Sequence, residues 1–516
     1  MLDEVHERGA ATDLLLGLLK KILRRRKGTL RVVVASATVG GGQGLDTMAI
    51  WCSDGEGGLR AAVLSLEGRA HPVEVAYLAE PCANYVARAA QVAMDIHRYE
   101  EPGDVLVFMP GMEMTLNLCG EMGSDDDDND EAGTWQRMNW YFQAYGGSSL
   151  PAMVFKLYSA LPPHMQTFAL KPARRGVRKV VVATAIAETS VTLPGVVYVV
   201  DPGLQRLPWR DPRRGGLQAL LTGPAPQASA VQRAGRAGRV RPGKCFRLYT
   251  EDFFHRRLAA QGVPELQRGC GLTTSVLLLA ALGVRDAARF EWPAPPGARA
   301  LADALEQLYS LGAIDDDCIL TKPVGELMAE MPTEPMIAKA LISSYDFECT
   351  EEMLTIAAMV SVQNIFIHPK NSKDLREKLE EAMGQFAVRE GDHVTYLNVY
   401  EDYAGGGGDP EWCAEYCVNR PALAKAVHIR AQLKRYLEML CKEKSIQSCQ
   451  GDIQKIQKAL VAGFFSQAAR IGPDGKYRTV RNGTEVTIHP SSVFAKFGAP
   501  AEHIIFHEAV FTDQVG

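Results

Sequence analysis

The first 250 residues alternate apolar runs with amphipathic segments. Five apolar runs, rich in β-branched side chains, occupy residues 30–35, 104–109, 154–158, 179–183 and 196–200. Runs of this length and composition are typical of strands that are buried on both faces of a parallel sheet. Apolar residues recur at helical spacing over residues 12–27 and 84–99. This alternation predicts an α/β fold with a parallel sheet.

The pattern changes beyond residue 250. Helical spacing dominates residues 272–282 and 324–443, with a glycine-rich loop at residues 405–408. The last part of the chain alternates as strands do, at residues 460–469, 477–480, 486–492 and 504–506. Before this change, Pro-Arg turns at residues 208–214 favour a β-hairpin. We therefore expect helical domains after the α/β part and a small β domain at the end.

Composition bounds the class of protein. With 516 residues, 47% hydrophobic and 23% charged, the chain is long enough for several domains. The net charge of -5 excludes a globally basic surface, so nucleic acid would have to bind in local basic grooves. Among the 11 cysteines, Cys413 and Cys417 lack a second pair or nearby histidines, which argues against zinc. Acidic residues 125–131 are expected to form a solvated loop rather than a metal site.

No leader sequence and no apolar run of about 20 residues occurs, so we expect an intracellular protein with reduced cysteines and no membrane span.

Residues 232–239, Gln-Arg-Ala-Gly-Arg-Ala-Gly-Arg, indicate the most specific chemistry. On a helix, Arg236 and Arg239 would lie one turn apart and could hold the oxygens of a transferring phosphoryl group from one side. Gly235 and Gly238 would let the backbone approach closely. The alternative is the basic face of a surface helix, which does not require glycines at those two positions.

Other motifs accompany this stretch in a fixed order. Residues 2–8 are Leu-Asp-Glu-Val-His-Glu-Arg, residues 36–38 are Ser-Ala-Thr, and residues 183–190 are Ala-Thr-Ala-Ile-Ala-Glu-Thr-Ser. With residues 201–203 and 243–250, they resemble the superfamily 2 helicases, specifically the DEAH-box RNA helicases, and most closely the DEAH-box helicase thirty-five group. The resemblance continues nearly to the C-terminus.

The resemblance implies hydrolysis of ATP with Mg²⁺ between two lobes. The catalytic residues it implies are Asp3, Glu4, His6, Gln232, Arg236 and Arg239. Asp3 and Glu4 would hold Mg²⁺, and Glu4 would also orient and deprotonate the attacking water. His6 would couple the acidic motif to Gln232.

Binding residues follow from the same resemblance. The implied contacts to ATP are Phe168, Thr184, Ser190 and Gly235. The implied contacts to RNA are Ser36, Thr38, Ser159, Thr184, Thr189, Tyr477 and Arg478. For Phe168, a place in the core and stacking on adenine are equally open. Ala185 and Pro194 stand where the family usually has polar residues, which predicts a weaker grip on RNA or weaker coupling to the nucleotide.

The motif Gly-x-x-x-x-Gly-Lys-Ser/Thr does not occur in the 516 residues. In the family this phosphate-binding loop precedes the acidic motif, so we expect an N-terminally truncated first lobe. The predicted fold is α/β, with tandem RecA-like lobes followed by winged-helix, helical-bundle (ratchet) and OB-fold domains. The predicted bounds are 1–68 for the remnant of the first lobe, 69–250 for the second lobe, 251–322 for the winged helix, 323–452 for the helical bundle and 453–516 for an incomplete OB-fold.

The implied function is that of an ATP-dependent RNA helicase in pre-mRNA splicing, acting in the nucleus on single-stranded RNA or on a duplex with a single-stranded tail. A G-patch type activator and spliceosomal proteins are the implied partners, and no membrane is involved. Because the phosphate loop is missing, we expect this chain alone to be inactive. Two alternatives stay open, a non-hydrolysing RNA-binding or adaptor fragment and a DNA helicase.

Overall fold

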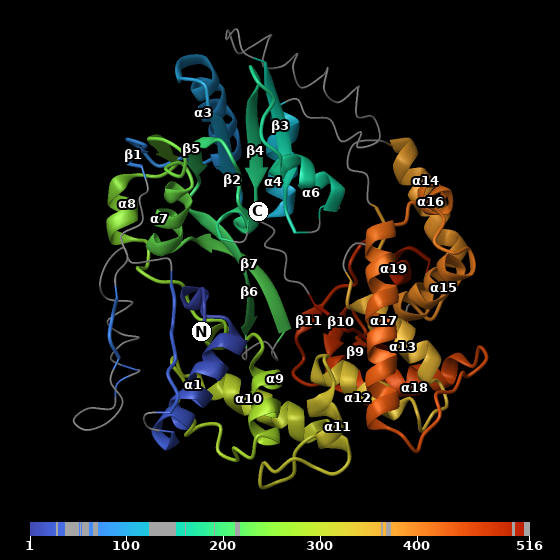
Figure 1. The fold of residues 1–516 in the computed structure, drawn as a ribbon. Coiled ribbons are helices and arrows are strands. Elements are labelled where there is room, and N and C mark those ends of the chain that lie inside the picture. Colours follow the sequence, from blue (N-terminus) through green and yellow to red (C-terminus); the bar gives the residue numbers. More distant parts are fainter. Residues whose placement is uncertain are drawn as a thin grey trace. The chain divides into compact units, whose positions relative to one another are not determined.

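The computed structural model describes residues 1–26, 29–36, 51, 53, 61–64, 71–122, 151–159, 161, 163–189, 191–211, 217–362, 365–367, 373–497 and 501–509. The chain separates into two compact units, Met1–Pro208 with Leu220–Pro264 and Trp209–Ala219 with Glu265–Gly516 (Figure 1). Three predictions lie outside the described residues: the acidic loop at 125–131 and the contacts from Thr38 and Ser190.

A six-stranded parallel sheet forms the centre of the first unit, with strand order β1-β8-β5-β2-β4-β3. Its strands are β1 (Val73–Tyr77), β2 (Asp104–Phe108), β3 (Ala152–Leu157), β4 (Arg178–Ala183), β5 (Val196–Asp201) and β8 (Gly243–Arg247). Strands β2, β4 and β5 are buried along their whole length. Four of the five predicted apolar runs are therefore strands of one parallel sheet.

Helices cover both faces of this sheet (Figure 1). The helices of the first unit are α1 (Ala10–Arg25), α3 (Tyr85–Tyr99), α4 (Met112–Glu121), α6 (Pro163–Leu170), α7 (Gln227–Gly235) and α8 (Glu251–Arg256), with the short 3-10 turns η1 (Val5–Glu7) and η2 (Ala185–Ala187). Val105 and Val107 pack with α3 and α4 on one face, and Leu106 and Phe108 pack with α6 and α7 on the other. Because both faces are covered, the four residues of β2 that follow Asp104 are all apolar.

Residues 30–35 do not form the predicted buried strand. Val33 and Val34 are 58% and 36% exposed. In the described part of the chain, this segment makes an isolated parallel bridge between Val34 and Leu2, with Leu2 N–H donating to the Val33 carbonyl at 2.8 Å. One neighbouring segment cannot cover both faces of a strand, so this prediction is wrong.

The arginine-rich stretch is not a single helix. Helix α7 ends at Gly235, and Arg236 begins tight turns in which each N–H donates to the carbonyl three residues earlier. These turns bring Gly238 against His71, whose N–H donates to the Gly238 carbonyl at 2.8 Å. A Cβ at Gly238 would lie 2.5 Å from the His71 carbonyl oxygen, so the close approach is confirmed at Gly238. The shared helix is a wrong prediction, and at Gly235 no described atom of the protein lies within 4 Å of such a Cβ.

The predicted hairpin is present as a two-stranded sheet of β6 (Leu204–Asp211) and β7 (Leu217–Pro224). The N–H of Ala225 donates to the Gly203 carbonyl at 2.8 Å and closes its base. The division between the two units cuts through both strands, because residues 209–219 belong to the second unit.

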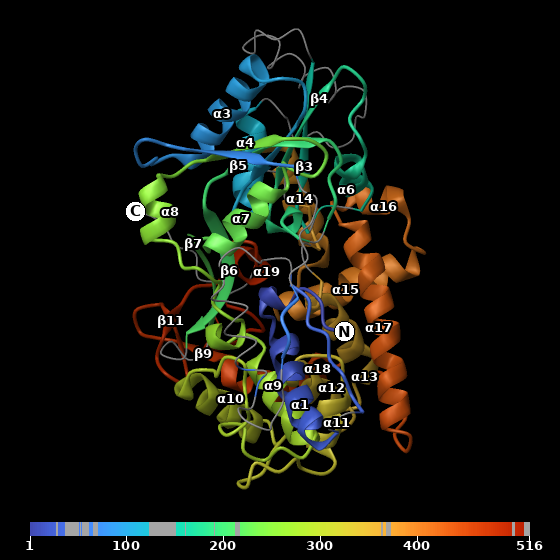
Figure 2. The ribbon, with the colours of Figure 1, turned by 60° about the vertical axis from the view of Figure 1, so that its left-hand side comes forward.

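The second unit consists of helices and one small sheet. Its helices are α9 (Leu272–Ala281), α10 (Ala298–Ser310), α11 (Val324–Glu330), α12 (Pro335–Ser343), α13 (Thr350–Val360), α14 (Lys373–Phe386), α15 (Asp392–Gly405), α16 (Pro410–Glu415), α17 (Arg420–Leu440), α18 (Ile453–Phe464) and α19 (Val493–Phe497). The long helix α17 packs along α13 (Figure 2). The sheet has the order β11-β10-β9-β12 and is antiparallel throughout. Its strands are β9 (Ala468–Ile471), β10 (Tyr477–Thr479), β11 (Glu485–Val486) and β12 (His503–Ile505).

The strand-like segment expected over residues 460–469 is wrong in its first half. The alternation expected over residues 460–469 belongs in part to α18, which continues to Phe464. Ile456, Leu460 and Gly463 are buried on one face of this helix, because they are separated by four and three residues. A strand begins only at Ala468.

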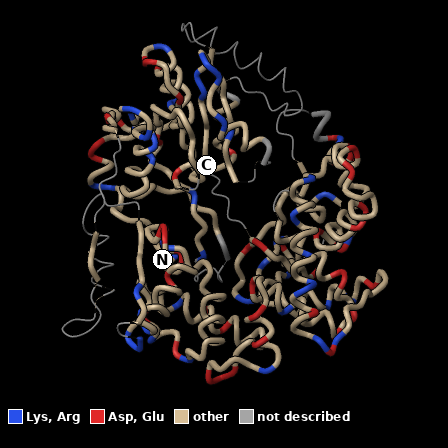
Figure 3. Tube along the Cα trace, in the orientation of Figure 1, with Lys and Arg blue, Asp and Glu red and all other residues tan. Residues whose placement is uncertain are grey.

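Acidic and basic residues alternate along the chain of both units (Figure 3), in agreement with the small net charge of -5. Within the described ranges, no helix is both long and apolar enough to cross a membrane.

The buried imidazole of His97 makes stability depend on pH. This residue of α3 is 2% exposed, and burial, aided by the positive charges of Arg178 and Arg98, lowers the pKa of His97 to about 4. An unfolded histidine has a pKa of about 6.5, so between pH 6.5 and 4 the unfolded state binds a proton that the folded state does not. We expect the free energy of unfolding to fall over this window as pH decreases, by up to about 1.4 kcal/mol per pH unit from this group.

Urea unfolding at pH 7 and pH 5 measures this effect. A His97→Gln variant should lose less stability between the two pH values than the wild type. Equal losses in both proteins would show that His97 is not the group responsible.

Candidate functional site

The acidic motif near the N-terminus forms a tight turn held by an ion pair. Glu4 and Arg8 flank η1, and both adopt left-handed backbone conformations, with φ of 51° and 52°. The Arg8 guanidinium binds the fully buried Asp13 carboxylate through two hydrogen bonds of 2.9 Å. The Glu4 N–H donates to Asp3 Oδ1 at 2.9 Å. Non-glycine residues in this conformation carry local strain and persist where the surroundings hold them, as the Arg8 pair does here.

His6 joins this turn to helix α7. Gln232 Nε2 lies 2.6 Å from His6 Nε2, and His6 Nδ1 lies 3.3 Å from Glu4 Oε2. If the Gln232 amide donates, Nε2 of the neutral imidazole is the acceptor and the proton is on Nδ1, which faces Glu4. The structure thus brings together His6 and Gln232, which are distant in sequence, with Glu4 next to them.

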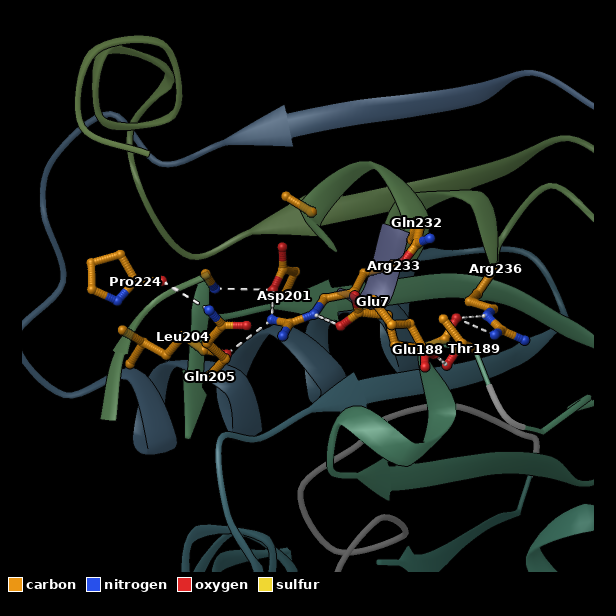
Figure 4. A network of polar contacts seen from close by, with 12 residues as sticks. Glu7, Glu188, Thr189, Asp201, Leu204, Gln205, Pro224, Gln232, Arg233 and Arg236 are labelled. Atoms are coloured by element: carbon orange, nitrogen blue, oxygen red, sulfur yellow. Dashed lines mark hydrogen bonds and ion pairs between the residues drawn. The ribbon is translucent and has the colours of Figure 1, made fainter. Parts of the chain in front are cut away.

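Arg233 is the centre of a buried network beside this contact (Figure 4). Its guanidinium binds Glu188 Oε2 at 3.0 Å, Asp201 Oδ1 at 2.8 Å and the Leu204 carbonyl at 3.0 Å. Burial opposes the charge, but the two carboxylates outweigh it and raise the pKa of Arg233 above its ordinary value. The side chain therefore remains a permanent cation that joins α7 to β5 and β6.

Arg236 is also turned into the protein. Its Nε donates to the Glu188 carbonyl at 2.8 Å and its Nη1 to the Val191 carbonyl at 2.7 Å. Burial, together with the nearby Arg239, lowers the pKa of Arg236 to about 10. Arg239 is exposed instead. The two guanidinium groups thus lie in the same electrostatic neighbourhood, but they do not face outward together as the predicted fork.

The segment after β4 supplies further members of the site. Thr189 Oγ1 donates to Glu7 Oε1 at 2.9 Å (Figure 4), which joins this segment to the acidic motif. Thr184 is half-buried and directly precedes η2. Ser159 is exposed, and Ser36 is half-buried.

Three further predicted binding residues make contacts of their own. Phe168 is half-buried on α6, with Lys171 Nζ 5.1 Å from its ring centroid. Tyr477 is buried, and its hydroxyl donates to the Ala501 carbonyl at 2.8 Å. Arg478 binds Asp474 through Nη1 at 2.9 Å. Tyr477 and Arg478 are both bonded to residues of the second unit, so their placement adds no support for contact with RNA.

The sequence analysis did not identify Glu188, Asp201 and Arg233 as members of one site. Each of them stood inside a motif that was recognised, but no spacing rule links residues 13 and 45 positions apart. The available signal was Asp201, a carboxylate at the end of an apolar run, which needs a buried partner if the run is a buried strand.

The acidic motif offers oxygen ligands that suit Mg²⁺. Asp3 is exposed, and Glu4 Oε2 is buried without a hydrogen bond to any described residue. Mg²⁺ is commonly bound through one or two carboxylates while it keeps several waters. No larger group of metal-binding side chains occurs among the residues that the structure describes. Asp3 and Glu4 therefore fit a hydrated Mg²⁺ ion.

Known domain families match four parts of the chain. The helicase conserved C-terminal domain matches residues 134–241, the winged-helix part of the helicase-associated domain 304–333, its ratchet-like part 334–396, and the oligonucleotide/oligosaccharide-binding (OB)-fold 456–515. Together with the parallel sheet, these matches confirm the predicted fold class and the order of these domains.

Whole-chain comparisons agree with the domain matches. The chain is 39% identical over 515 residues to the probable ATP-dependent RNA helicase DHX35 of Homo sapiens, covering 100% of this chain and 70% of that protein. It is 38% identical to the pre-mRNA-splicing factor ATP-dependent RNA helicase prp22 of Schizosaccharomyces pombe, covering 100% of this chain and 41% of that protein. The crystal structure of the E. coli DExH-box NTPase HrpB is similar with a TM-score of 0.65 and 28% identity, over 94% of this chain. The chain spans about half of that structure, 49% of its length.

The two arginines should differ in their effect on stability. Arg236 satisfies the carbonyls of Glu188 and Val191, so Arg236→Ala would leave buried acceptors unpaired at a cost of about 1–3 kcal/mol. Arg239 is exposed, so Arg239→Ala should leave the free energy of unfolding unchanged within error. Urea unfolding of the two variants beside the wild type makes the comparison. Equal destabilisation by both substitutions would contradict the different placements of the two side chains.

Proposed function

This chain belongs to the DEAH-box RNA helicase family, as a relative of the DHX35-like helicases, and on this premise we propose that it carries half of an ATP-hydrolysing site that drives remodelling of RNA. The other half is the phosphate-binding loop, which is not among these 516 residues. The proposed substrates are ATP and single-stranded RNA or a duplex with a single-stranded tail.

The contact between His6 and Gln232 is the main support for this proposal. It places the acidic motif beside α7 with a separation of 2.6 Å between the two nitrogen atoms. Glu4 and Arg239 both influence the charge of Arg236, so all three lie within electrostatic range of one another. A carboxylate base next to several cations is the arrangement that hydrolysis of a phosphoanhydride requires.

Glu4 is the proposed general base. Its carboxylate takes the proton of the attacking water, while His6 limits the positions that the carboxylate can adopt. Gln232 in turn holds the imidazole in the tautomer with the proton on Nδ1. The 3.3 Å separation between His6 Nδ1 and Glu4 Oε2 is longer than a good hydrogen bond, and such contacts commonly shorten when substrate is bound.

Asp3 and Glu4 would hold Mg²⁺, which when bound neutralises charge on the phosphate oxygens. Arg239 is exposed and would face the phosphoryl group as charge develops on it. Arg236 holds the backbone at Glu188 and Val191 and so keeps the segment after β4 in place. In this proposal Arg239 contacts the transferring group, and Arg236 positions the loop beside it.

The hydroxyls of Ser159, Thr184 and Thr189 are the proposed contacts to the RNA backbone in the first unit. A role in pre-mRNA splicing, nuclear localisation, and spliceosomal or G-patch type partners are proposed by analogy, since one relative is named as a splicing factor. The second candidate is a non-hydrolysing RNA-binding fragment, which the missing phosphate-loop motif favours.

We expect the 516-residue chain alone not to hydrolyse ATP, because loss of even one preorganised electrostatic group costs on the order of a hundredfold to a thousandfold in rate. A chimera that places the phosphate-loop segment of the human relative before Met1 should gain RNA-stimulated hydrolysis. Glu4→Gln should abolish that hydrolysis. Arg239→Ala should lower kcat by roughly a thousandfold while changing ATP affinity by less than about tenfold.

Hydrolysis by the unmodified chain that Glu4→Gln removes would contradict the expected inactivity of the chain alone. A chimera that hydrolyses ATP equally well with Glu4→Gln would overturn the role of Glu4. An Arg239→Ala chimera that loses ATP affinity but keeps near-normal turnover at saturating ATP would make Arg239 a binding residue.

We also expect the chain to bind single-stranded RNA weakly and in a salt-dependent way. If three lysine or arginine side chains neutralise phosphates, the affinity should fall roughly twentyfold between 50 and 200 mM salt. Fluorescence anisotropy with a labelled oligoribonucleotide measures both affinities, and duplex DNA of the same length is the control. Equal affinities at the two salt concentrations, or binding to the duplex DNA alone, would contradict the prediction.

A further inference from the structure

Strand β6 is held at both of its ends by an arginine. Its first residue, Leu204, offers its carbonyl to Arg233 Nη1 at 3.0 Å, within the buried network of the candidate site. Near its other end, Arg210 donates through Nη2 to Gln307 Oε1 of α10 at 3.2 Å. The first of these contacts lies within the first unit, and the second lies within the second unit.

The contact of Arg210 involves buried groups of the second unit. Gln307 is buried, and its Oε1 also accepts from Thr273 Oγ1 of α9 at 3.2 Å. Gly269, just before α9, has φ of +77°, and a Cβ on it would lie 3.0 Å from the Arg210 carbonyl oxygen. The backbone of β6 thus approaches the start of α9 closely enough that a glycine is required there.

Two acidic residues partly offset the effect of burial on Arg210. Burial lowers the pKa of Arg210, while Glu334 and Asp303 act in the opposite direction and favour the cation. Asp303 and Gln307 both belong to α10. Moving this half-buried guanidinium would break its hydrogen bond to Gln307 and weaken its attraction to the two carboxylates.

A second arginine ties the small β-sheet to the same helix. Arg481 lies in the turn after β10, where it pairs with Glu306 and lies 4.0 Å from Asp303 through Nη2. Arg210, Asp303, Gln307 and Arg481 all line one small cavity of about 20 Å³, which has room for roughly one water molecule. Helix α10 therefore presents a single polar cluster to the hairpin and to the β-sheet.

We propose that Arg210 is a positioning residue that fixes the outer part of β6, and with it the β6–β7 hairpin, to α10. This inference rests on the proposed RNA-remodelling function for its use, but the attachment of the hairpin can be tested without it. The contact of Arg210 holds the hairpin of β6 and β7. If the proposed function is correct, the position of this hairpin would decide how an RNA strand passes a junction with a duplex.

Hydrogen–deuterium exchange of the 516-residue chain tests the attachment. Arg210→Ala should make the amides of residues 204–211 and 217–224 exchange at least tenfold faster, while those of α3 and α17 keep the wild-type rate. Arg210→Lys, which retains the charge and one donor, should restore most of this protection. Arg289→Ala is the matched control, because Arg289 is 90% exposed in the same unit and should leave the hairpin unchanged.

If Arg210→Ala fails to fold, Gln307→Met removes the acceptor with little change of shape and should give the same local increase in exchange. Unchanged hairpin exchange in a folded Arg210→Ala or Gln307→Met protein would overturn the proposal. So would an increase that Arg210→Lys does not reduce at all, because the charge would then have no part in positioning.

Affinity for two different RNAs distinguishes a positioning role of Arg210 from a general role in stability. A general loss of stability would weaken the binding of both RNAs. Arg210→Ala should bind a single-stranded oligoribonucleotide as the wild type does, and a single-strand–duplex junction at least fivefold more weakly. Equal loss for both RNAs would overturn the positioning role. If the wild type binds neither RNA, the proposed function fails, and the exchange measurement still decides whether Arg210 holds the hairpin.

Discussion

The buried guanidinium of Arg233 is the constraint on which the first unit depends. A cation this deep in a protein costs several kcal/mol unless it is paired, and here the carboxylates of Glu188 and Asp201 pair with it from two different segments. Tyr249 donates its hydroxyl to the second oxygen of Asp201 at 3.1 Å, so the acid is satisfied on both sides. Removing any one member would leave a buried charge or acceptor without a partner, and the three segments can therefore shift only together.

This arrangement explains how the chemistry-bearing residues keep their places. The carbonyl of Glu188, whose side chain is fixed by Arg233, accepts from Arg236. The next residue, Thr189, binds Glu7 of the acidic motif. The last turn of α7 and the turn that follows it therefore hold the loop after β4 from two directions, and Gln232 of α7 contacts His6.

The two units use charge in different ways. In the first unit the buried Arg233 guanidinium pairs directly with the carboxylates of Glu188 and Asp201. In the second unit Arg210 binds the Gln307 amide of α10, and Arg481 pairs with Glu306 of the same helix.

Much of the fold was determined by the sequence alone. The apolar runs within β2, β4 and β5 predict a parallel sheet that is covered on both faces. Residues 30–35 have the same composition but remain exposed, because burial depends on neighbouring segments that composition does not report. The stretch 460–464 shows the same limit. A short apolar run is compatible with the periodicity of a strand or of a helix, and packing within the second unit favours the helix.

For the site, the motifs identified the residue types, and only the tertiary structure decided their roles. His6 and Gln232 were expected to meet through the family resemblance, and the fold brings them into contact. The fork of Arg236 and Arg239 was expected from a helical spacing that ends at Gly235, where the chain turns so that Gly238 can meet His71. Which arginine is buried and which is exposed depends on the carbonyls that the neighbouring loop presents, and those positions are set by packing between segments far apart in the chain.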